Sequence, residues 1–194
     1  VKALKNDLKI EDIDINYHVR LGETKLRSFR DGWRHLRFML LYSPLFLFFI
    51  PGIFLFLIGL FSMLQLYFST ITLLGIQLYI HPMFVSAMFI LVGYQLIMFS
   101  AFSRIYAVTH LKDKSKFLDK MIRYLTIERA SIFGGLVVIA GILIYLVIFL
   151  KWLNTGFGDI NEIKNSILSL TFIVLGVQTI AASFMMSIIG IGER

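Results

Sequence analysis

The 194-residue sequence contains no cysteine, which excludes disulfide bonds and thiolate metal sites. Its His, Asp and Glu residues show no metal-ligand spacing, and no glycine-rich phosphate loop follows a strand-like segment. No Asp, Glu, Lys or Arg occurs between Arg37 and Arg104. The first residue is Val1 rather than Met, and the stretch after it lacks the basic, apolar and small-residue order of a signal peptide, so we expect the chain to be part of a longer protein.

Apolar residues make up 58% of the chain, whereas a soluble domain has roughly 45–50%. One small core cannot hide that excess, so lipid is expected to solvate much of the surface. The net charge is +7, and the cations cluster beside apolar segments. This placement favours an anionic lipid or a phosphorylated lipid as the partner over nucleic acid.

Residues 10–20 alternate between apolar and polar side chains, a period of two that predicts a β-strand with one buried face. A strand needs a sheet, and the chain offers no clear soluble partner strand. We therefore expect residues 1–25 to be the tail of a cytoplasmic catalytic domain that precedes Val1. An irregular polar leader is the alternative.

Residues 26–37 predict an amphipathic helix that lies in the membrane interface. Its apolar positions recur at spacings of three and four, which is helical, and continue to residue 40: Leu26, Phe29, Trp33, Leu36 and Leu40. Four arginines follow the same spacing on an adjacent flank: Arg27, Arg30, Arg34 and Arg37. Such a helix places its apolar flank among acyl chains and its arginines at phosphate level. We expect Arg27, Arg30, Trp33, Arg34 and Arg37 to act mainly as an anchor.

The apolar segments after this helix predict an all-α integral membrane fold with four transmembrane helices in two hairpins. The spans are 38–62, 83–103, 131–150 and 165–192. The first hairpin covers 38–103, with a hairpin or re-entrant link at 64–82, and the second covers 131–194. A third full span at 64–82 is the alternative. The basic loop 104–130 is expected to hold a second interfacial amphipathic helix.

The distribution of cations predicts the orientation. The leader and the 104–130 loop hold nine and seven Lys or Arg residues, whereas the 64–82 link holds none and the 151–164 loop holds two. The positive-inside rule then places both termini and the 104–130 loop in the cytoplasm. No charged residue lies within the predicted spans, which disfavours an ion or proton pathway.

The second and fourth spans share a short internal echo. Gly93, Gln95 and Ser100 recur at one constant offset as Gly176, Gln178 and Ser183. The echo is compatible with two related helical hairpins and also with coincidence among apolar segments. The two glutamines need partners in lipid, and hydrogen bonds between helices that hold the bundle are favoured over a transport site.

The segment 17–44 resembles the membrane-proximal end of family 2 polyprenyl-phosphate glycosyltransferases, the dolichyl-phosphate mannose or glucose synthase group. The residues that carry the resemblance are Tyr17-His18, Arg20, Gly22-Glu23-Thr24-Lys25-Leu26 and Ser28-Phe29-Arg30-Asp31-Gly32-Trp33-Arg34. The loop 104–129 is also similar to the four-span bacterial and archaeal branch. Thr24 stands where serine is usual and keeps the hydroxyl, and Val19 stands where proline is common.

The resemblance implies a protein of a bacterial or archaeal plasma membrane that works with an upstream GT-A domain. That domain would use a divalent metal, Mg or Mn, to bind a nucleotide sugar, so no catalytic or metal-binding residue is expected in this chain. Arg20, Thr24 and Lys25 would bind phosphate of the lipid acceptor or the donor. Arg supplies a planar fork that matches phosphate, and Lys supplies a compact charge.

The leading hypothesis is therefore the membrane-anchoring, lipid-recognising part of an enzyme that transfers a sugar to dolichyl or undecaprenyl phosphate. Alone, without the nucleotide-sugar domain, the chain should be inactive. The bundle is also compatible with a homo-oligomer. A non-enzymatic accessory subunit is the main alternative, followed by a small lipid flippase or transporter, which the uncharged spans disfavour.

Overall fold

The computed structural model describes residues 8–9, 11–15, 28–42, 45–69, 71–73, 76–78, 80–111 and 127–191. The chain divides into two compact units, Val1–Tyr42 and Ser43–Arg194. In the first unit, helix α2 spans Ser28–Tyr42 and carries Asp31 in its first turn. A carboxylate at that position interacts favourably with the positive end of the helix dipole.

The strand predicted at 10–20 is wrong for residues 11–15, which have no regular secondary structure. Ile13 and Ile15 are 82% and 80% exposed. A strand requires a hydrogen-bonded neighbour, and the described part of the first unit provides none.

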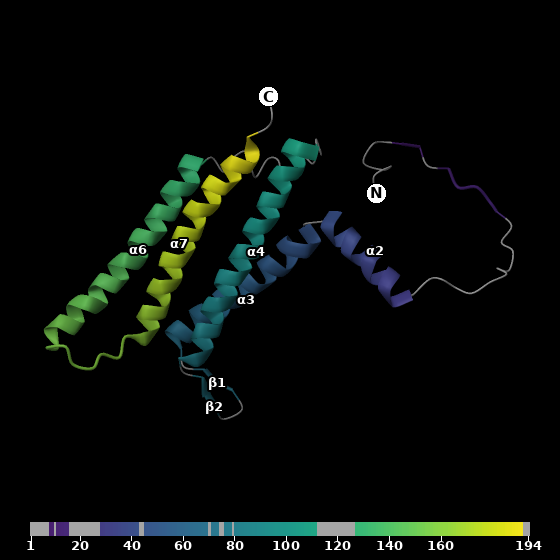
Figure 1. Cartoon of the computed structure of the whole chain (residues 1–194). Coiled ribbons are helices and arrows are strands. Elements are labelled where there is room, and N and C mark those ends of the chain that lie inside the picture. Colours follow the sequence, from purple (N-terminus) through teal and green to yellow (C-terminus); the bar gives the residue numbers. More distant parts are fainter. Residues whose placement is uncertain are drawn as a thin grey trace. The chain divides into compact units, whose positions relative to one another are not determined.

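The described residues of the second unit contain four helices that are long and apolar enough to span a membrane, as predicted (Figure 1). Their bounds are α3, Ile50–Phe68; α4, His81–Leu111; α6, Ile127–Asn154; and α7, Ile163–Gly190. On α6, Leu136, Ile139 and Leu143 are 60%, 53% and 55% exposed. Such apolar exposure along a whole helix fits lipid as the surrounding solvent.

A π-helical segment, Leu45–Phe49, precedes α3, and Pro51 lies in the first turn of α3. Proline has no backbone N–H, so the regular helical hydrogen-bond pattern cannot continue through it. The first span consequently runs from Phe46 to Phe68 rather than over 38–62. Residues 38–42 belong instead to α2.

The link between α3 and α4 contains a β-hairpin. Strands β1, Ile71–Leu73, and β2, Ile76–Leu78, pair antiparallel with Thr72 opposite Gln77. The link therefore forms neither a third span nor a re-entrant helix over its described residues. The hairpin lies at the lower end of the second unit in Figure 1, as does the connection between α6 and α7.

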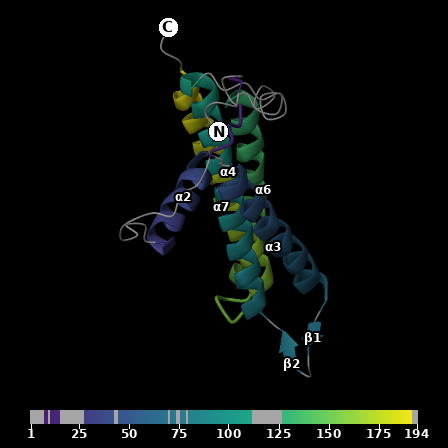
Figure 2. The ribbon, with the colours of Figure 1, turned by 90° about the vertical axis from the view of Figure 1, so that its right-hand side faces the viewer.

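The four helices form a row in the order α3, α4, α7, α6, so that α4 and α7 join the two hairpins (Figures 1 and 2). Each hairpin packs through glycine. A Cβ atom on Gly52 would lie 2.9 Å from the Gly93 carbonyl oxygen, and one on Gly134 would lie 2.8 Å from that of Gly176. These positions admit no side chain, which allows the helix backbones to approach closely.

Each hairpin has a second glycine contact, seven residues after the first glycine of α3 and of α6. A Cβ on Gly59 would lie 2.7 Å from the Ser86 carbonyl oxygen, and one on Gly141 would lie 2.9 Å from that of Ser169. With the helices matched in this way, eight residues of α4 recur 83 positions later in α7: Ser86, Phe89, Ile90, Gly93, Gln95, Ile97, Ser100 and Ile105. The three-residue echo is thus part of a repeat of the whole hairpin.

The first turn after α6 shows how the sequence ends this helix. The N–H of Phe157 bonds the carbonyl of Trp152, and the N–H of Gly156 bonds that of Leu153, both at 3.1 Å. Gly156 has φ +68°, the left-handed conformation that glycine adopts without penalty. The rings of Trp152 and Phe157 meet edge to face at 4.8 Å. This is a Schellman ending with its apolar contact.

Candidate functional site

Two surfaces of the described chain combine charge with apolar side chains, and the first is helix α2. Its apolar side chains are exposed within the first unit: Phe29 at 89%, Trp33 at 59% and Leu36 at 48%. Arg30 and Arg34 are exposed as well. Arg37 also belongs to α2. The helix thus carries an apolar stripe and a basic stripe side by side, which is the composition of an interfacial helix.

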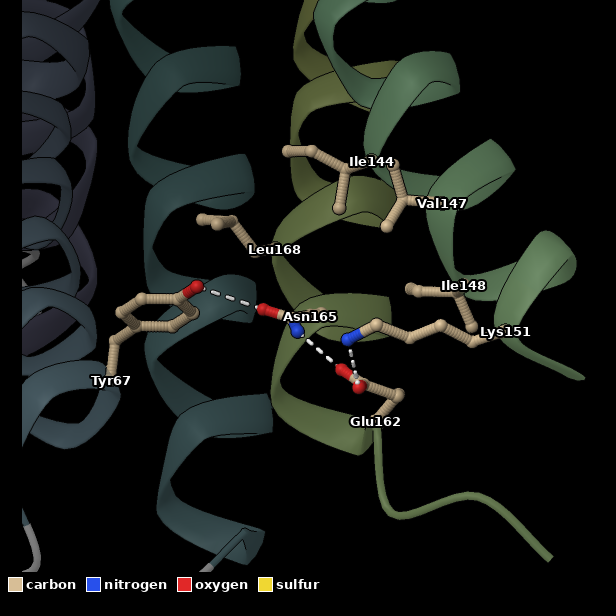
Figure 3. A pocket seen from close by; sticks show the side chains of 8 residues that line it. All are labelled: Tyr67, Ile144, Val147, Ile148, Lys151, Glu162, Asn165 and Leu168. Atoms are coloured by element: carbon tan, nitrogen blue, oxygen red, sulfur yellow. Dashed lines mark hydrogen bonds and ion pairs between the residues drawn. The ribbon is translucent and has the colours of Figure 1, made fainter.

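The second surface is a cleft of about 190 Å³ at the β-hairpin end of the second unit (Figure 3). Four apolar side chains of α6 and α7 form one wall: Ile144, Val147, Ile148 and Leu168. Four polar side chains lie at its rim: Tyr67, Lys151, Glu162 and Asn165. The cleft therefore draws on α3, α6, α7 and the residue that precedes α7.

The polar side chains of the rim form one connected network (Figure 3). The Tyr67 hydroxyl donates to Asn165 Oδ1 at 2.8 Å, and Asn165 Nδ2 donates to the Glu162 carboxylate. Lys151 Nζ lies 2.6 Å from Glu162 Oε1. The hydrogen bonds from Lys151 and Asn165 lower the pKa of Glu162. The carboxylate therefore stabilises the network at neutral pH, and this contribution is lost as the pH falls through its lowered pKa.

One more contact joins the two hairpins at this end: Lys164 Nζ donates to the Leu66 carbonyl oxygen at 2.7 Å. Sequence reasoning noted only a short polar loop at 151–164. Tyr67 and Asn165 lie 98 positions apart in the chain, and no local pattern signals that they meet.

At the middle of the spans, Gln178 Nε2 donates to Gln95 Oε1 at 3.2 Å. The expected interhelical hydrogen bonding of these glutamines is confirmed, and the structure adds that each is the partner of the other. Beside it, the hydroxyls of Tyr94 and Thr179 lie 2.6 Å apart. Gln95 and Gln178 are equivalent positions of the two hairpins. The contact between α4 and α7 therefore brings equivalent positions of the two hairpins together.

Residues 101–190 match the model of a family described as the glycosyltransferase family 2 C-terminal transmembrane region. Over 190 residues the chain is 32% identical to a hexosyltransferase of low-salt glycan biosynthesis from Haloferax volcanii. Both matches support a glycosyltransferase family 2 C-terminal transmembrane region over residues 101–190. That alignment covers 98% of this chain and 46% of the relative, so the chain spans less than half of that protein. No solved structure matches the chain.

The matched residues include the end of α4, all of α6 and all of α7. It includes the rim residues Lys151, Glu162 and Asn165 of the cleft but not Tyr67. The residues predicted to bind phosphate, Arg20, Thr24 and Lys25, lie outside the described residues, as does Arg27. The interfacial helix predicted within 104–130 falls largely on residues 112–126, which are also outside them.

The helices of the second unit extend beyond the predicted spans, and the ends of the spans consequently carry charge. The second span reaches Thr109 and includes Arg104, which is only 7% exposed. The prediction of spans without charged residues is therefore wrong for the helix ends. Helical hydrogen bonds continue past the last apolar residue, because the backbone pattern does not depend on the polarity of the side chains.

Proposed function

We propose that this chain is the membrane part of a glycosyltransferase that moves a sugar from a nucleotide sugar to a polyprenyl phosphate. Its role is to anchor the catalytic domain and to present the lipid phosphate to it. The observation that carries the proposal is α2, with exposed Arg30 and Arg34 beside exposed Phe29 and Trp33, in a chain that also holds four span-length helices. The family 2 match and the hexosyltransferase activity in the relative's name support it.

The proposed chemistry divides the work between this chain and a separate domain. The described residues hold no group of three or more His, Cys, Asp or Glu that could bind a metal. We therefore assign the nucleotide-sugar site, with its Mg or Mn, to an upstream GT-A domain. Arg20, Lys25 and the Thr24 hydroxyl then hold phosphate at the membrane surface, where neutralising charge around the transferring group lowers the barrier.

The anchoring role of α2 predicts a change in its depth when its charge is removed. In a Trp152→Phe background, where Trp33 is the one remaining tryptophan, Arg30→Gln with Arg34→Gln should reduce quenching of Trp33 by lipids brominated just below the head group. Each surface cation near an anionic leaflet contributes about 1 kcal/mol. Two losses therefore weaken the seating by roughly thirtyfold in anionic bilayers.

The matched control for this experiment is Lys5→Gln with Lys9→Gln, which removes equal charge ahead of α2. This control should leave the quenching of Trp33 unchanged. High salt should reduce the difference between the anchor variant and the parent, because salt screens exposed charges. Equal quenching in all three proteins at low salt would exclude an interfacial seat that depends on arginine.

We also propose that both termini and the 104–130 loop face the cytoplasm. Because the chain has no cysteine, single cysteines report position directly. Leu73→Cys and Phe157→Cys, at the β-hairpin end of the second unit, should react with an impermeant maleimide on intact cells. Lys112→Cys should react only after permeabilisation. Protection of both Leu73→Cys and Phe157→Cys contradicts this orientation.

A further inference from the structure

The cleft at the β-hairpin end has the lining expected of a site for an amphiphilic molecule, with apolar residues on one side and polar residues at the rim. This inference rests on the proposed function, which places the second unit in a membrane. The apolar wall of the cleft begins at Ile144 and its charged rim includes Lys151, both on α6. Seven residues of α-helix rise about 10 Å. The lining thus passes from apolar to charged along the direction in which a membrane lipid lies, with the charged end toward the helix termini.

We propose that this cleft binds the uncharged, hydroxyl-rich head group of a membrane glycolipid, with the first carbons of its acyl chain against Ile144, Val147 and Leu168. The hydrogen-bonding capacity of the rim carries the assignment. Lys151 is 54% exposed and spends one donor on Glu162, which leaves two of its three donors. Asn165 retains one donor, and Tyr67 and Glu162 retain acceptor positions.

The mixture of remaining donors and acceptors matches hydroxyl groups, each of which both donates and accepts. A phosphate would accept only, and it would face the carboxylate of Glu162 as well as the ammonium of Lys151. The rim side chains bear one positive and one negative charge in an ion pair of 2.6 Å, so their charges balance. The cleft therefore favours a polar ligand without net charge over an anion.

A comparison of the two hairpins shows that the polar rim is not needed for the packing of the bundle. The glycine contacts recur in both hairpins, but the rim does not: Ser69 stands at the position equivalent to Lys151, and Pro82 at that of Asn165. Phe149 is the equivalent of Tyr67. Because the first hairpin packs in the same way without these groups, helix packing alone does not require them.

The test is photolabelling of the full chain in phosphatidylcholine nanodiscs that contain a minority of monoglucosyl diacylglycerol with a diazirine at the start of one acyl chain. Labelled peptides are mapped by mass spectrometry. We expect labelling of residues 144–168 to fall about tenfold in Val147→Trp, which fills the cleft and keeps the polar network. Leu146→Trp adds the same ring to the neighbouring lipid-facing position and should label like the parent.

A second variant removes the polar network and keeps the apolar wall. Lys151→Met with Glu162→Met should also reduce labelling about tenfold. If this variant fails to fold, as seen by gel filtration, Val147→Trp still decides the question. Parent-level labelling in Val147→Trp would overturn the proposal. Stronger labelling of residues 144–168 by the matching phosphatidic acid probe would also overturn it, because it would identify an anion site.

Discussion

Gly134→Val should destabilise the membrane bundle by about 3 kcal/mol or more, whereas Gly135→Val should leave its stability within about 0.5 kcal/mol of the parent. A Cβ on Gly134 would lie 2.8 Å from the Gly176 carbonyl oxygen, a backbone atom that cannot rotate away. A Cβ on the adjacent Gly135 would meet nothing within 4 Å. The two variants share composition and helix propensity, so the difference isolates the contact between α6 and α7.

The measurement is thermal unfolding of each purified variant in the same detergent, followed by gel filtration and by circular dichroism. Gly176→Val should match Gly134→Val, since its Cβ would lie 2.6 Å from the Gly134 carbonyl oxygen. Equal melting temperatures for Gly134→Val and Gly135→Val would show that α6 and α7 are not held at this distance in solution.

Arg20→Ala and Lys25→Ala should each lower sugar transfer by about 100-fold in a transferase-active form of the protein that contains this chain. Both cations are proposed to hold phosphate during transfer and so to stabilise charge in the transition state. Removing either one therefore raises the barrier to transfer. Membrane insertion should be unchanged, because the four span-length helices lie after these residues.

The control for this pair is Lys9→Ala, which removes a cation that precedes the segment from Arg20 to Lys25. Transfer is measured as radiolabelled sugar moved into the lipid fraction at matched protein levels. Arg20→Lys should recover part of the lost activity if charge dominates, and little if the planar guanidinium fork is required. Parent-like transfer in both alanine variants would remove Arg20 and Lys25 from the proposed site.

The number of span-length helices could be predicted from sequence, but their ends could not. The uncharged interval and the later apolar segments predicted four spans because lipid excludes charge, and all four are present. The ends of the helices depend on backbone hydrogen bonds, which continue across the boundary between apolar and charged residues. Helix α2 therefore continues to Tyr42 and α4 to Leu111. Near Pro51 the chain forms a π-helical segment that no apolar pattern signals.

The repeat and the cleft show two different limits of sequence reasoning. Gly93 and Gly176 could be matched from sequence because the residues around them recur at the same offset in two apolar segments. Only the contacts of these glycines with Gly52 and Gly134 show that the whole hairpin recurs. The cleft has no sequence signature, because its rim joins α3 to residues about a hundred positions later. The alternation at 11–15 misled for the opposite reason, since a strand depends on a neighbour and not on its own pattern alone.

The contact between Gln95 and Gln178 shows how one chain with two hairpins differs from a pair of separate, identical hairpins. Two identical copies of one hairpin, in contact through this amide pair, would form a symmetric dimer. Both copies would then carry the same side chains at equivalent positions. Joining the copies into one chain frees each to change separately. In this chain glycine stands at the shared contacts of both halves, while Lys151 and Asn165 have no counterpart in the first half. A fused pair can therefore carry a single specialised cleft, which a dimer of identical hairpins cannot.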